Sequence, residues 1–286
     1  MNIVKTKKKL EEAVSAFRKD GHQINFIPTM GALHEGHLSL LEQGIQLGGK
    51  TVCSIFVNPT QFNDPEDLKK YPRPLEKDIA LLESVGCDLL FLPDVNEMYE
   101  DNEVEWNLDL GMLDRVLEGE KRPGHFQGVT QIVFKLFSAV QPDRAIFGQK
   151  DLQQFLVIEE MVRQKGLPVQ LIMGDTLREE SGLALSSRNV RLSEAGKKKA
   201  LVISKALQHV QARMPIVAEG KLTLANLQQE AMALIQNTPG VSLEYFALCD
   251  RATLLEADDS TPYDQLVALV AAWVEGVRLI DNIVLK

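Results

Sequence analysis

The chain has 286 residues, of which 45% are hydrophobic and 25% charged, so it can bury a large core without extensive disorder. This length suits two domains. The formal net charge of -9 repels nucleic-acid phosphates and anionic membranes. The composition therefore predicts a soluble globular protein that binds neither nucleic acid nor a membrane.

The cysteines and the apolar stretches predict a cytoplasmic location. Cys53, Cys87 and Cys249 are odd in number and far apart, which argues against a disulfide framework and a thiolate zinc site. The longest apolar stretch, residues 266–274, is shorter than the roughly 20 residues that a membrane span needs. The lysine cluster at residues 5–9 precedes no apolar signal core, and we interpret it as a solvated helix face.

Short apolar stretches alternate with helix-length amphipathic segments in the first half of the chain. Such alternation is typical of βαβ units and a parallel sheet. We predict an α/β fold in which a Rossmann-like domain over residues 1–175 precedes a smaller α+β domain over 176–286. The candidate strands of the first domain are residues 24–29, 51–57, 88–92, 144–147 and 169–173.

The second domain is predicted from a change of pattern after residue 174. Helical segments at about 194–214 and 222–237 precede strand-like residues 243–249 and 265–273. Residues 175–193, rich in Ser, Arg and Gly, lie where a mobile lid or a cleft wall is expected.

Three predicted strands of the first domain end in unusual polar sequences. These are PTMG at 28–31, shortly before His34, then NPTQ at 58–61 and GQKD at 148–151. Because ligands of open α/β sheets bind outside the carboxyl ends of the strands, we expect the three segments to meet at one site.

The first of these segments leads into two histidines, His34 and His37, in an HxGH pattern. If a helix begins near Gly36, both imidazoles can approach a phosphate chain at its positive end and stabilise a triphosphate as one oxygen leaves. The alternative is a pair of surface histidines beside a tight turn. A zinc-protease HExxH site fits less well, because its histidines are four residues apart.

The other strand ends supply candidate substrate residues. The Gln61 amide suits hydroxyls and a carboxylate, although a surface Gln in an Asn-Pro turn is an alternative. Lys150 follows a strand end and a Gly, as in phosphate sites, although the full P-loop pattern is absent. Gln154, one helical turn further, faces the same side and can share a substrate with Gln61. The alternative is a set of surface side chains.

Three further segments are candidates for ligand contacts. Asp78 can hold Mg²⁺, or it can simply complement a helix N-terminus. Residues 122–129, RPGHFQGV, suggest a shaped loop at a ligand, although turn chemistry alone explains them. Two hydroxyls and a guanidinium in Ser186, Ser187 and Arg188 can clamp an oxyanion, although such triplets are common in flexible loops.

Together the motifs resemble the pantothenate synthetase family, in the family's order and from the first predicted strand to the C-terminus. They are PTMGALHEGH, FVNPTQF, YPRP, RPGHFQGV, KLF, FGQKD, LQQ, GLALSSRN and AAW…RLIDN. The HxGH element alone resembles the wider nucleotidyltransferase superfamily. The resemblance implies an ATP-dependent ligase that condenses pantoate with β-alanine through a pantoyl-adenylate, uses Mg²⁺ and forms a homodimer. It implies a first domain that binds nucleotide and pantoate, and a second that forms a lid.

The resemblance also implies roles for individual residues. It makes His37 the proton-donating or charge-neutralising catalytic residue, assisted by His34 and Lys150, and places the substrate pantoate between Gln61 and Gln154. The implied ATP contacts are Met30, His34, His37, Gly148, Gln149, Lys150, Asp151, Leu177, Leu185, Ser186, Ser187 and Arg188.

Four residues depart from the family pattern. Thr60 replaces a frequent Met, Gln127 a frequent Arg, Gln149 a frequent Glu and Ser181 a frequent Asp. These departures bear on nucleotide affinity, lid closure and metal dependence.

Two other functions remain open from the sequence alone. A nucleotidyltransferase would move a nucleotidyl group onto a phosphorylated substrate, but Gln61 and Gln154 are neutral where a phosphate acceptor calls for basic groups. A non-catalytic nucleotide sensor would bind ATP in the same cleft without turnover.

Overall fold

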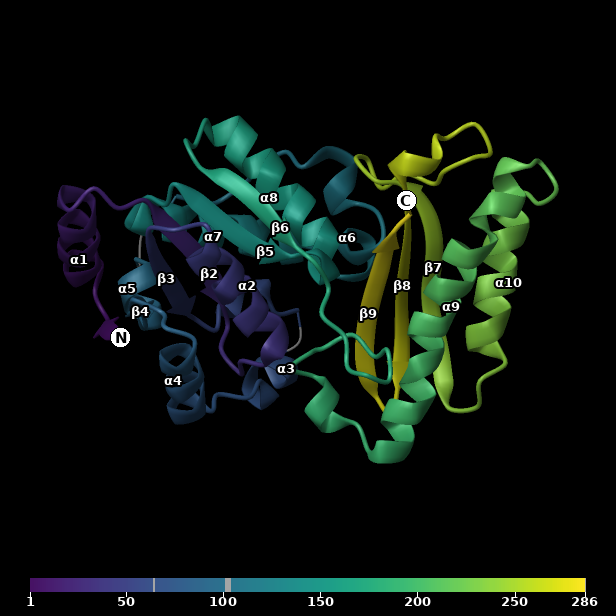
Figure 1. Cartoon of the computed structure of the whole chain (residues 1–286), viewed down its shortest axis with the longest axis horizontal. Helices are drawn as coiled ribbons and strands as arrows, with labels where there is room; N and C mark the ends of the chain where they lie inside the picture. The colour runs from purple at the N-terminus through teal and green to yellow at the C-terminus, as the bar shows by residue number, and fades with distance from the viewer. Residues whose placement is uncertain (64, 101–103, 286) are drawn as a thin grey trace. The chain divides into compact units, whose positions relative to one another are not determined.

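The computed structural model describes residues 1–63, 65–100 and 104–285 (Figure 1). The chain forms two compact units. The first contains residues 1–149 and 153–175, and the second contains residues 150–152 together with those from 176 onward. Three residues between the two segments of the first unit therefore pack with the second.

The first unit is built on a six-stranded parallel sheet with the strand order β1-β4-β3-β2-β5-β6. The strands are β1 (Asn2–Val4), β2 (Ile24–Thr29), β3 (Lys50–Ile55), β4 (Leu89–Phe91), β5 (Arg144–Gly148) and β6 (Gln170–Gly174). All five predicted strands are confirmed to within two residues at either end. The sequence did not indicate β1, whose three residues are too few to show a pattern.

The strand order reverses between β2 and β5. From β2 the chain proceeds outward through β3 and β4, then returns to add β5 and β6 on the other side of β2. Such a reversal leaves a crevice at the carboxyl ends of the two strands, where open α/β sheets bind their ligands. The loop with His34 follows β2, and Gly148 ends β5.

Both faces of this sheet are covered by helices, as the period-two alternation of a strand requires. Phe26 packs into a core with α1 (Lys7–Lys19), α7 (His125–Val140) and α8 (Leu152–Lys165). Its neighbour Ile27 packs on the opposite side with α2 (Glu35–Gln46) and α4 (Leu75–Ser84). The short helices of this unit are α3 (Pro65–Lys70), α5 (Val95–Met98), α6 (Glu118–Lys121), η1 (Pro59–Gln61) and η2 (Gly111–Asp114). The 3-10 turn η3 (Gln149–Asp151) has its first residue in this unit and the other two in the second.

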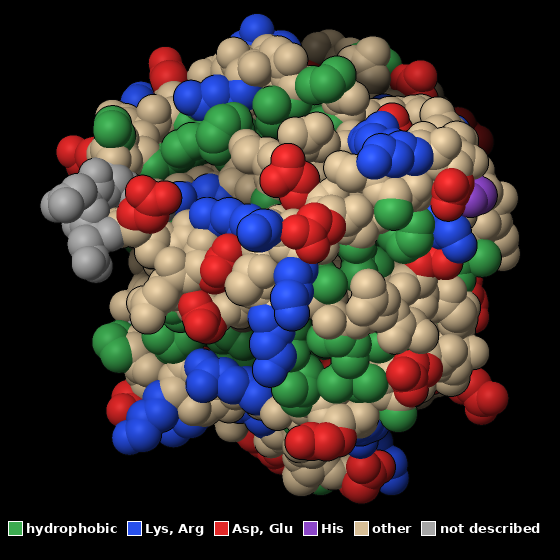
Figure 2. Space-filling view, turned by 90° about the vertical axis from the view of Figure 1, so that its left-hand side faces the viewer, with side chains coloured by type: hydrophobic (Ala, Val, Ile, Leu, Met, Phe, Trp, Pro, Cys, Tyr) green, Lys and Arg blue, Asp and Glu red, His purple; other side chains and the backbone are tan. Residues whose placement is uncertain are grey.

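The predicted solvated lysine face is confirmed in α1. Lys8 and Lys9 are exposed, whereas Leu10 and Val14 of the same helix are buried. On the molecular face shown in Figure 2, Lys and Arg side chains are interspersed with Asp and Glu side chains.

The second unit contains an antiparallel sheet of β7 (Val241–Asp250), β8 (Leu266–Val274) and β9 (Val277–Val284), in that order. Helices α9 (Glu194–Ala218) and α10 (Leu224–Gln236) pack against it around a separate apolar core. Two 3-10 turns, η4 (Asn189–Arg191) and η5 (Tyr263–Gln265), complete the unit. The two predicted helices and two predicted strands are confirmed, and β9 is an additional strand. No helix in the described part of the chain has the length and apolarity to span a membrane.

Candidate active site

The loop that follows β2 is held by the carboxylate of Asp78, which is 1% exposed in the first turn of α4. Its Oδ2 accepts a hydrogen bond from Ala32 N and its Oδ1 one from Leu33 N, both at 2.8 Å. Ala32 has a φ of 51°, in the left-handed region that is costly for a side chain with a Cβ. A Cβ on Gly31 would lie 3.0 Å from Asp78 Oδ2. Asp78 therefore fixes the backbone that precedes the two histidines.

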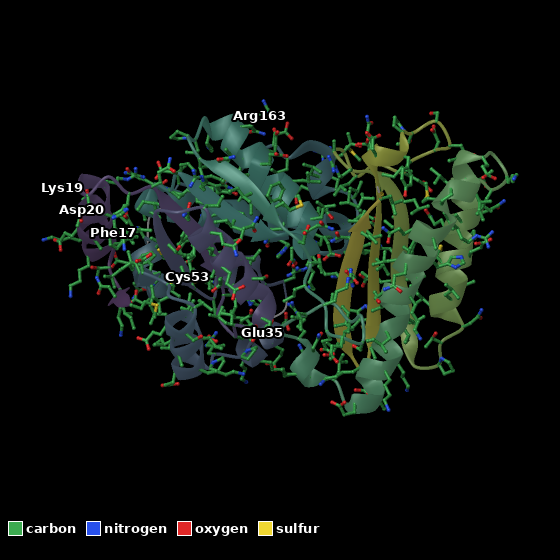
Figure 3. All side chains as sticks on the ribbon, viewed as in Figure 1. Phe17, Lys19, Asp20, Glu35, Cys53 and Arg163 are labelled. Atoms are coloured by element: carbon green, nitrogen blue, oxygen red, sulfur yellow. The ribbon has the colours of Figure 1, made fainter. Side chains whose placement is uncertain are left out.

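The two histidines lie at the N-terminal end of α2, as predicted. His34 is the N-cap, and its Nδ1 accepts a hydrogen bond from Gly36 N at 3.2 Å. Because Nδ1 accepts, a neutral His34 ring carries its proton on Nε2, where it can donate to an anion. The His34 and His37 ring centroids are 4.1 Å apart. Glu35, the first helical residue, is labelled in Figure 3.

Hydrogen bonds fix the orientation of the Gln61 amide, which is 8% exposed. The Gly128 carbonyl can only accept, so the Asn58 NH₂ group must face it, at 3.1 Å. The same Nδ2 lies 3.2 Å from Gln61 Oε1. The NH₂ end of Gln61 is then presented next to Met30, with Nε2 2.8 Å from Sδ. Of the three segments predicted to meet, those at the ends of β2 and β3 do so here, and the group offered there is a donor. The meeting of residues 148–151 with them stays a prediction.

A second layer of contacts holds Asn58, which is 0% exposed. Its Oδ1 accepts from the Tyr99 hydroxyl at 2.7 Å and from Thr60 Oγ1 at 3.2 Å. Thr60 is one of the departures from the family pattern, and here its hydroxyl joins this network. All four polar positions of the Asn58 amide are thereby directed, so this side chain has one orientation.

The backbone of Gln61 is held from the start of α7. Its carbonyl accepts from His125 Nδ1 at 2.7 Å, and Arg122 Nη1 lies 3.1 Å from Nε2 of the same ring. Since a carbonyl only accepts and a guanidinium only donates, His125 is neutral with its proton on Nδ1. A Cβ on Gly128 would lie 2.4 Å from Thr60 O, so α7 approaches η1 as closely as glycine allows.

The predicted loop at residues 122–129 is therefore only partly a loop. Helix α7 begins at His125, after Gly124 with a φ of 78°. The glycines and the proline mark a helix start and a close backbone approach, and His125 supports Gln61. The sequence does not indicate that His125 contacts Gln61, because the two residues are 64 positions apart in the chain.

Next to Gln154, the glutamine at position 153 has a structural role. Gln153 is 3% exposed, accepts from Glu118 N and donates to the carbonyls of Leu113 and Val116. Gln154 is only half-buried. It lies on α8, which begins at Leu152, so Lys150 precedes this helix in a 3-10 turn.

Of the remaining candidate ATP residues, Gly148 and Gln149 are in the first unit, and the others, from Lys150 to Arg188, are in the second. Arg178 and Ala184 form an antiparallel bridge, and Leu185 N donates to Leu177 O at 3.0 Å. A turn follows in which Ser186 Oγ accepts from Arg188 N at 3.2 Å. Ser186, Ser187 and Arg188 are therefore carried at the end of a small hairpin, and Lys150 belongs to the same unit.

Two further departures from the family pattern take structural roles. Gln127 accepts from Leu108 N at 3.0 Å and donates to Leu108 O and to Asp114 Oδ2, both at 2.9 Å. Ser181 Oγ lies 3.5 Å from Leu183 N in the hairpin. Both side chains organise the backbone of loops.

The cysteines are free and buried. Burial raises the pKa of the Cys53 thiol well above its usual value, that of Cys87 from 9.0 to about 11 and that of Cys249 from 9.0 to about 12. These thiols are therefore protonated at neutral pH, and Cys53 lies within the large sheet (Figure 3).

Across residues 1–63, 65–100 and 104–285, no group of three or more His, Cys, Asp or Glu side chains is placed to hold a metal ion. The predicted magnesium ligand Asp78 uses both carboxylate oxygens to bind backbone N–H groups. These contacts give Asp78 a clear role in the loop, while its predicted metal role stays a prediction.

Comparisons with known proteins match the chain over almost its whole length. A family model described as pantoate-beta-alanine ligase matches residues 2–284. The pantothenate synthetase of Cytophaga hutchinsonii is 43% identical over 268 residues, covering 94% of this chain and 93% of the relative. That of Bacteroides thetaiotaomicron is 44% identical over 286 residues, covering 100% and 99%.

Solved structures agree. The crystal structure of pantothenate synthetase from Thermus thermophilus has a TM-score of 0.91 and 41% identity, covering 99% of both chains. That of pantoate-beta-alanine ligase from Francisella tularensis, complexed with beta-gamma ATP and beta-alanine, has a TM-score of 0.81 and 31% identity, covering 99% and 97%. The Rossmann-like sheet, the HxGH helix start and the oriented Gln61 thus occur in a chain that belongs to the pantoate-β-alanine ligase family, the pantothenate synthetases.

Proposed function

We propose that this ATP-dependent ligase condenses pantoate with β-alanine through a pantoyl-adenylate intermediate. The observation that carries the proposal is the pair of oriented donors in the first unit, the Gln61 NH₂ group and the His34 Nε2–H at the start of α2. The Gln61 NH₂ group suits the hydroxyls and carboxylate of pantoate, and the His34 Nε2–H suits a phosphate. The Francisella relative, crystallised with β-alanine and a form of ATP, supports the choice of substrates.

The chemistry requires activation of the pantoate carboxylate, because an oxide is a poor leaving group. A carboxylate oxygen attacks the α-phosphorus of ATP, the bond to the bridging oxygen breaks, and pyrophosphate leaves. The amine of β-alanine then attacks the acyl carbon, loses a proton and expels AMP. No covalent bond to the enzyme forms, so positioning and exclusion of water supply much of the rate enhancement.

We propose that His37 neutralises charge or donates a proton as pyrophosphate leaves, assisted by His34 and Lys150. Gln61 and Gln154 bind pantoate and receive β-alanine. The proposed ATP contacts are Met30, His34, His37, Gly148, Gln149, Lys150, Asp151, Leu177, Leu185, Ser186, Ser187 and Arg188. We also propose that the second unit acts as a lid.

Mg²⁺ is proposed to arrive with ATP, because this ion keeps several waters and takes most of its other ligands from phosphates. It would neutralise phosphate charge when bound. Asp78 fits poorly as a direct ligand, since both its oxygens already accept backbone hydrogen bonds. A homodimer and a cytoplasmic location are further proposals, the latter consistent with three free thiols.

The experiment that tests the function follows release of AMP and pyrophosphate from ATP, Mg²⁺ and pantoate, with and without β-alanine. We expect sustained AMP release only when both pantoate and β-alanine are present, and its loss in His37→Ala. Pyrophosphate release that is indifferent to the amine would instead indicate a nucleotidyltransferase. ATP binding without turnover would indicate a sensor.

A further inference from the structure

Strand β9 carries two adjacent polar side chains that are almost completely buried. Asp281 is 4% exposed and Asn282 is 2% exposed. Burial of a carboxylate and an amide costs free energy unless both are hydrogen-bonded. Their partners belong to the two segments of the second unit that are proposed above to bind ATP.

Asp281 binds the base of the hairpin that leads to Ser186. Arg178 Nη1 lies 2.6 Å from Asp281 Oδ2, and Arg178 Nη2 lies 3.0 Å from Oδ1. This two-point pairing fixes direction as well as distance, which a single contact does not. Arg178 also donates to the carbonyl of Gly182 at 3.3 Å, within the hairpin itself.

Backbone hydrogen bonds carry this anchoring to the proposed ATP contacts. Glu179 N donates to Leu183 O at 2.8 Å, and Leu185 N to Leu177 O at 3.0 Å. Ser186 directly follows this paired arm. Displacement of Arg178 from Asp281 would therefore displace the serines and Arg188 as well.

Asn282 binds the other segment. Its Nδ2 donates to the main-chain carbonyl of Lys150 at 2.9 Å. Lys150 lies between segments of the first unit in the sequence, yet residues 150–152 pack with the second. The bond from Asn282 links the backbone of this proposed phosphate-binding lysine to β9.

Successive side chains of a strand point to opposite faces, so two adjacent residues can hold two separate segments. We propose that Asp281 and Asn282 are positioning residues for ATP use, which hold to one strand the Leu177–Leu185 hairpin that leads to Ser186, and the Lys150 turn. The inference rests on the proposed function, because it takes these segments to contact ATP. Figure 1 shows β9 as the edge strand beside β8.

The test compares steady-state kinetics of Asp281→Asn and Asn282→Ala with the wild type. We expect KM for ATP to rise about tenfold or more and kcat to fall, while KM for pantoate changes less than about twofold, because Gln61 is in the first unit. Arg178→Lys keeps the positive charge but loses the two-point contact with Asp281, so we expect KM for ATP to rise about threefold. Because the Arg178 side chain is 25% exposed, whereas that of Asp281 is 3% exposed, Arg178→Lys is also the milder variant should Asp281→Asn fail to fold.

The matched control is Glu244→Gln. Glu244 of β7 pairs with Arg278 of β9, with Arg278 Nε 2.9 Å from Glu244 Oε2, and both are outside the proposed ATP segments. We expect this variant to lower Tm but to leave both KM values unchanged. A rise in KM for ATP in the control equal to that in Asp281→Asn would overturn the inference, since loss of stability alone would then explain both.

Lys150→Met and Ser187→Ala separate this inference from the function on which it rests. If they impair ATP use but Asp281→Asn, Asn282→Ala and Arg178→Lys do not, the positioning role is wrong and the ATP assignment stands. If neither Lys150→Met nor Ser187→Ala affects ATP use, both the assignment and the positioning role are wrong. Impairment in both groups, with pantoate binding preserved, supports the positioning role.

Discussion

Asn58 Nδ2 lies 3.2 Å from Gln61 Oε1, and this contact decides which end of the Gln61 amide is offered to a substrate. If the side-chain amide of Gln61 were rotated by 180°, its NH₂ group would face the NH₂ group of Asn58. Two donors facing each other in a buried position are unfavourable, so only one orientation persists. The specificity of the proposed pantoate site thus depends on a residue that need not touch the substrate.

We predict that Asn58→Ala raises KM for pantoate by at least about tenfold, because Gln61 loses its orientation. The lost buried hydrogen bonds should also reduce the free energy of unfolding by about 1–3 kcal/mol. Steady-state kinetics with pantoate and ATP varied separately, together with urea unfolding, measure both effects. KM for ATP should change far less.

Asn63→Ala is a suitable control for this variant. Asn63 is two residues beyond Gln61 and makes an exposed hydrogen bond to the carbonyl of Pro123. In Asn63→Ala we expect the free energy of unfolding to change by less than about 0.5 kcal/mol and KM for pantoate to stay unaltered. An equal loss of pantoate affinity in Asn63→Ala would mean that general loosening of this segment, and not the orientation of Gln61, is responsible.

The close approach of α7 to η1 predicts an unusual sign for a helical Gly→Ala substitution. Alanine normally stabilises a helix interior by about 1 kcal/mol relative to glycine. In Gly128→Ala the new Cβ would lie 2.4 Å from Thr60 O and 2.9 Å from Gln61 N, both of them backbone atoms. We therefore expect destabilisation of about 1–3 kcal/mol by thermal or urea unfolding, together with weaker pantoate binding.

Ser138→Ala, at an exposed position later in α7, provides the comparison. It should change stability by less than about 0.5 kcal/mol. Were Gly128→Ala to stabilise the protein as an ordinary helix position does, the close packing of α7 on η1 would be wrong.

The sequence predicts the fold well where patterns are local. Five strands and the position of His34 at a helix start follow from apolar runs and from the HxGH motif. Strand β1 is too short for a pattern, and β9 mixes apolar residues with Arg278, Asp281 and Asn282, so neither was predicted. The burial of Asp281 and Asn282 makes sense only through partners more than 100 positions away in the sequence.

The same limit applies to the candidate site. Asp78 was predicted either to hold Mg²⁺ or to complement a helix N-terminus, but its bonds go to the backbone of Ala32 and Leu33, 46 and 45 positions away. His125 and Asn58 are parts of recognisable motifs, but their roles depend on contacts that the chain makes only after folding. Residue types therefore indicate the chemistry of the site, and tertiary contacts assign the supporting roles.

The buried thiols predict both low reactivity and a pH dependence of stability. A raised pKa keeps Cys87 protonated in the folded state, whereas the unfolded chain releases the proton near pH 9.0. Stability from this group is thus fully present below pH 9.0 and is lost as pH rises towards about 11. The slope is at most about 1.4 kcal/mol per pH unit for one thiol.

Two measurements check this prediction. Iodoacetamide at pH 8 should modify none of the three cysteines in the native protein and all three in denaturant. Urea unfolding of Cys87→Ala between pH 9 and 11 should show a shallower loss of stability than the wild type. Alkylation at equal rates in native and denatured protein would contradict the burial.

The variant Asp78→Asn separates the two roles of Asp78, support of the β2 loop and binding of Mg²⁺. In Asp78→Asn an NH₂ group replaces one oxygen and must face the N–H of Ala32 or Leu33, so a backbone donor is left without an acceptor. We expect a loss of about 1–3 kcal/mol in the free energy of unfolding and a large fall in kcat, since the strained Ala32 and the following His34 lose their support. Raising the Mg²⁺ concentration should not restore turnover. If Asp78 instead binds Mg²⁺, the variant should keep its stability and regain activity as Mg²⁺ is increased, and a titration with Mg²⁺ alongside thermal unfolding distinguishes the two outcomes.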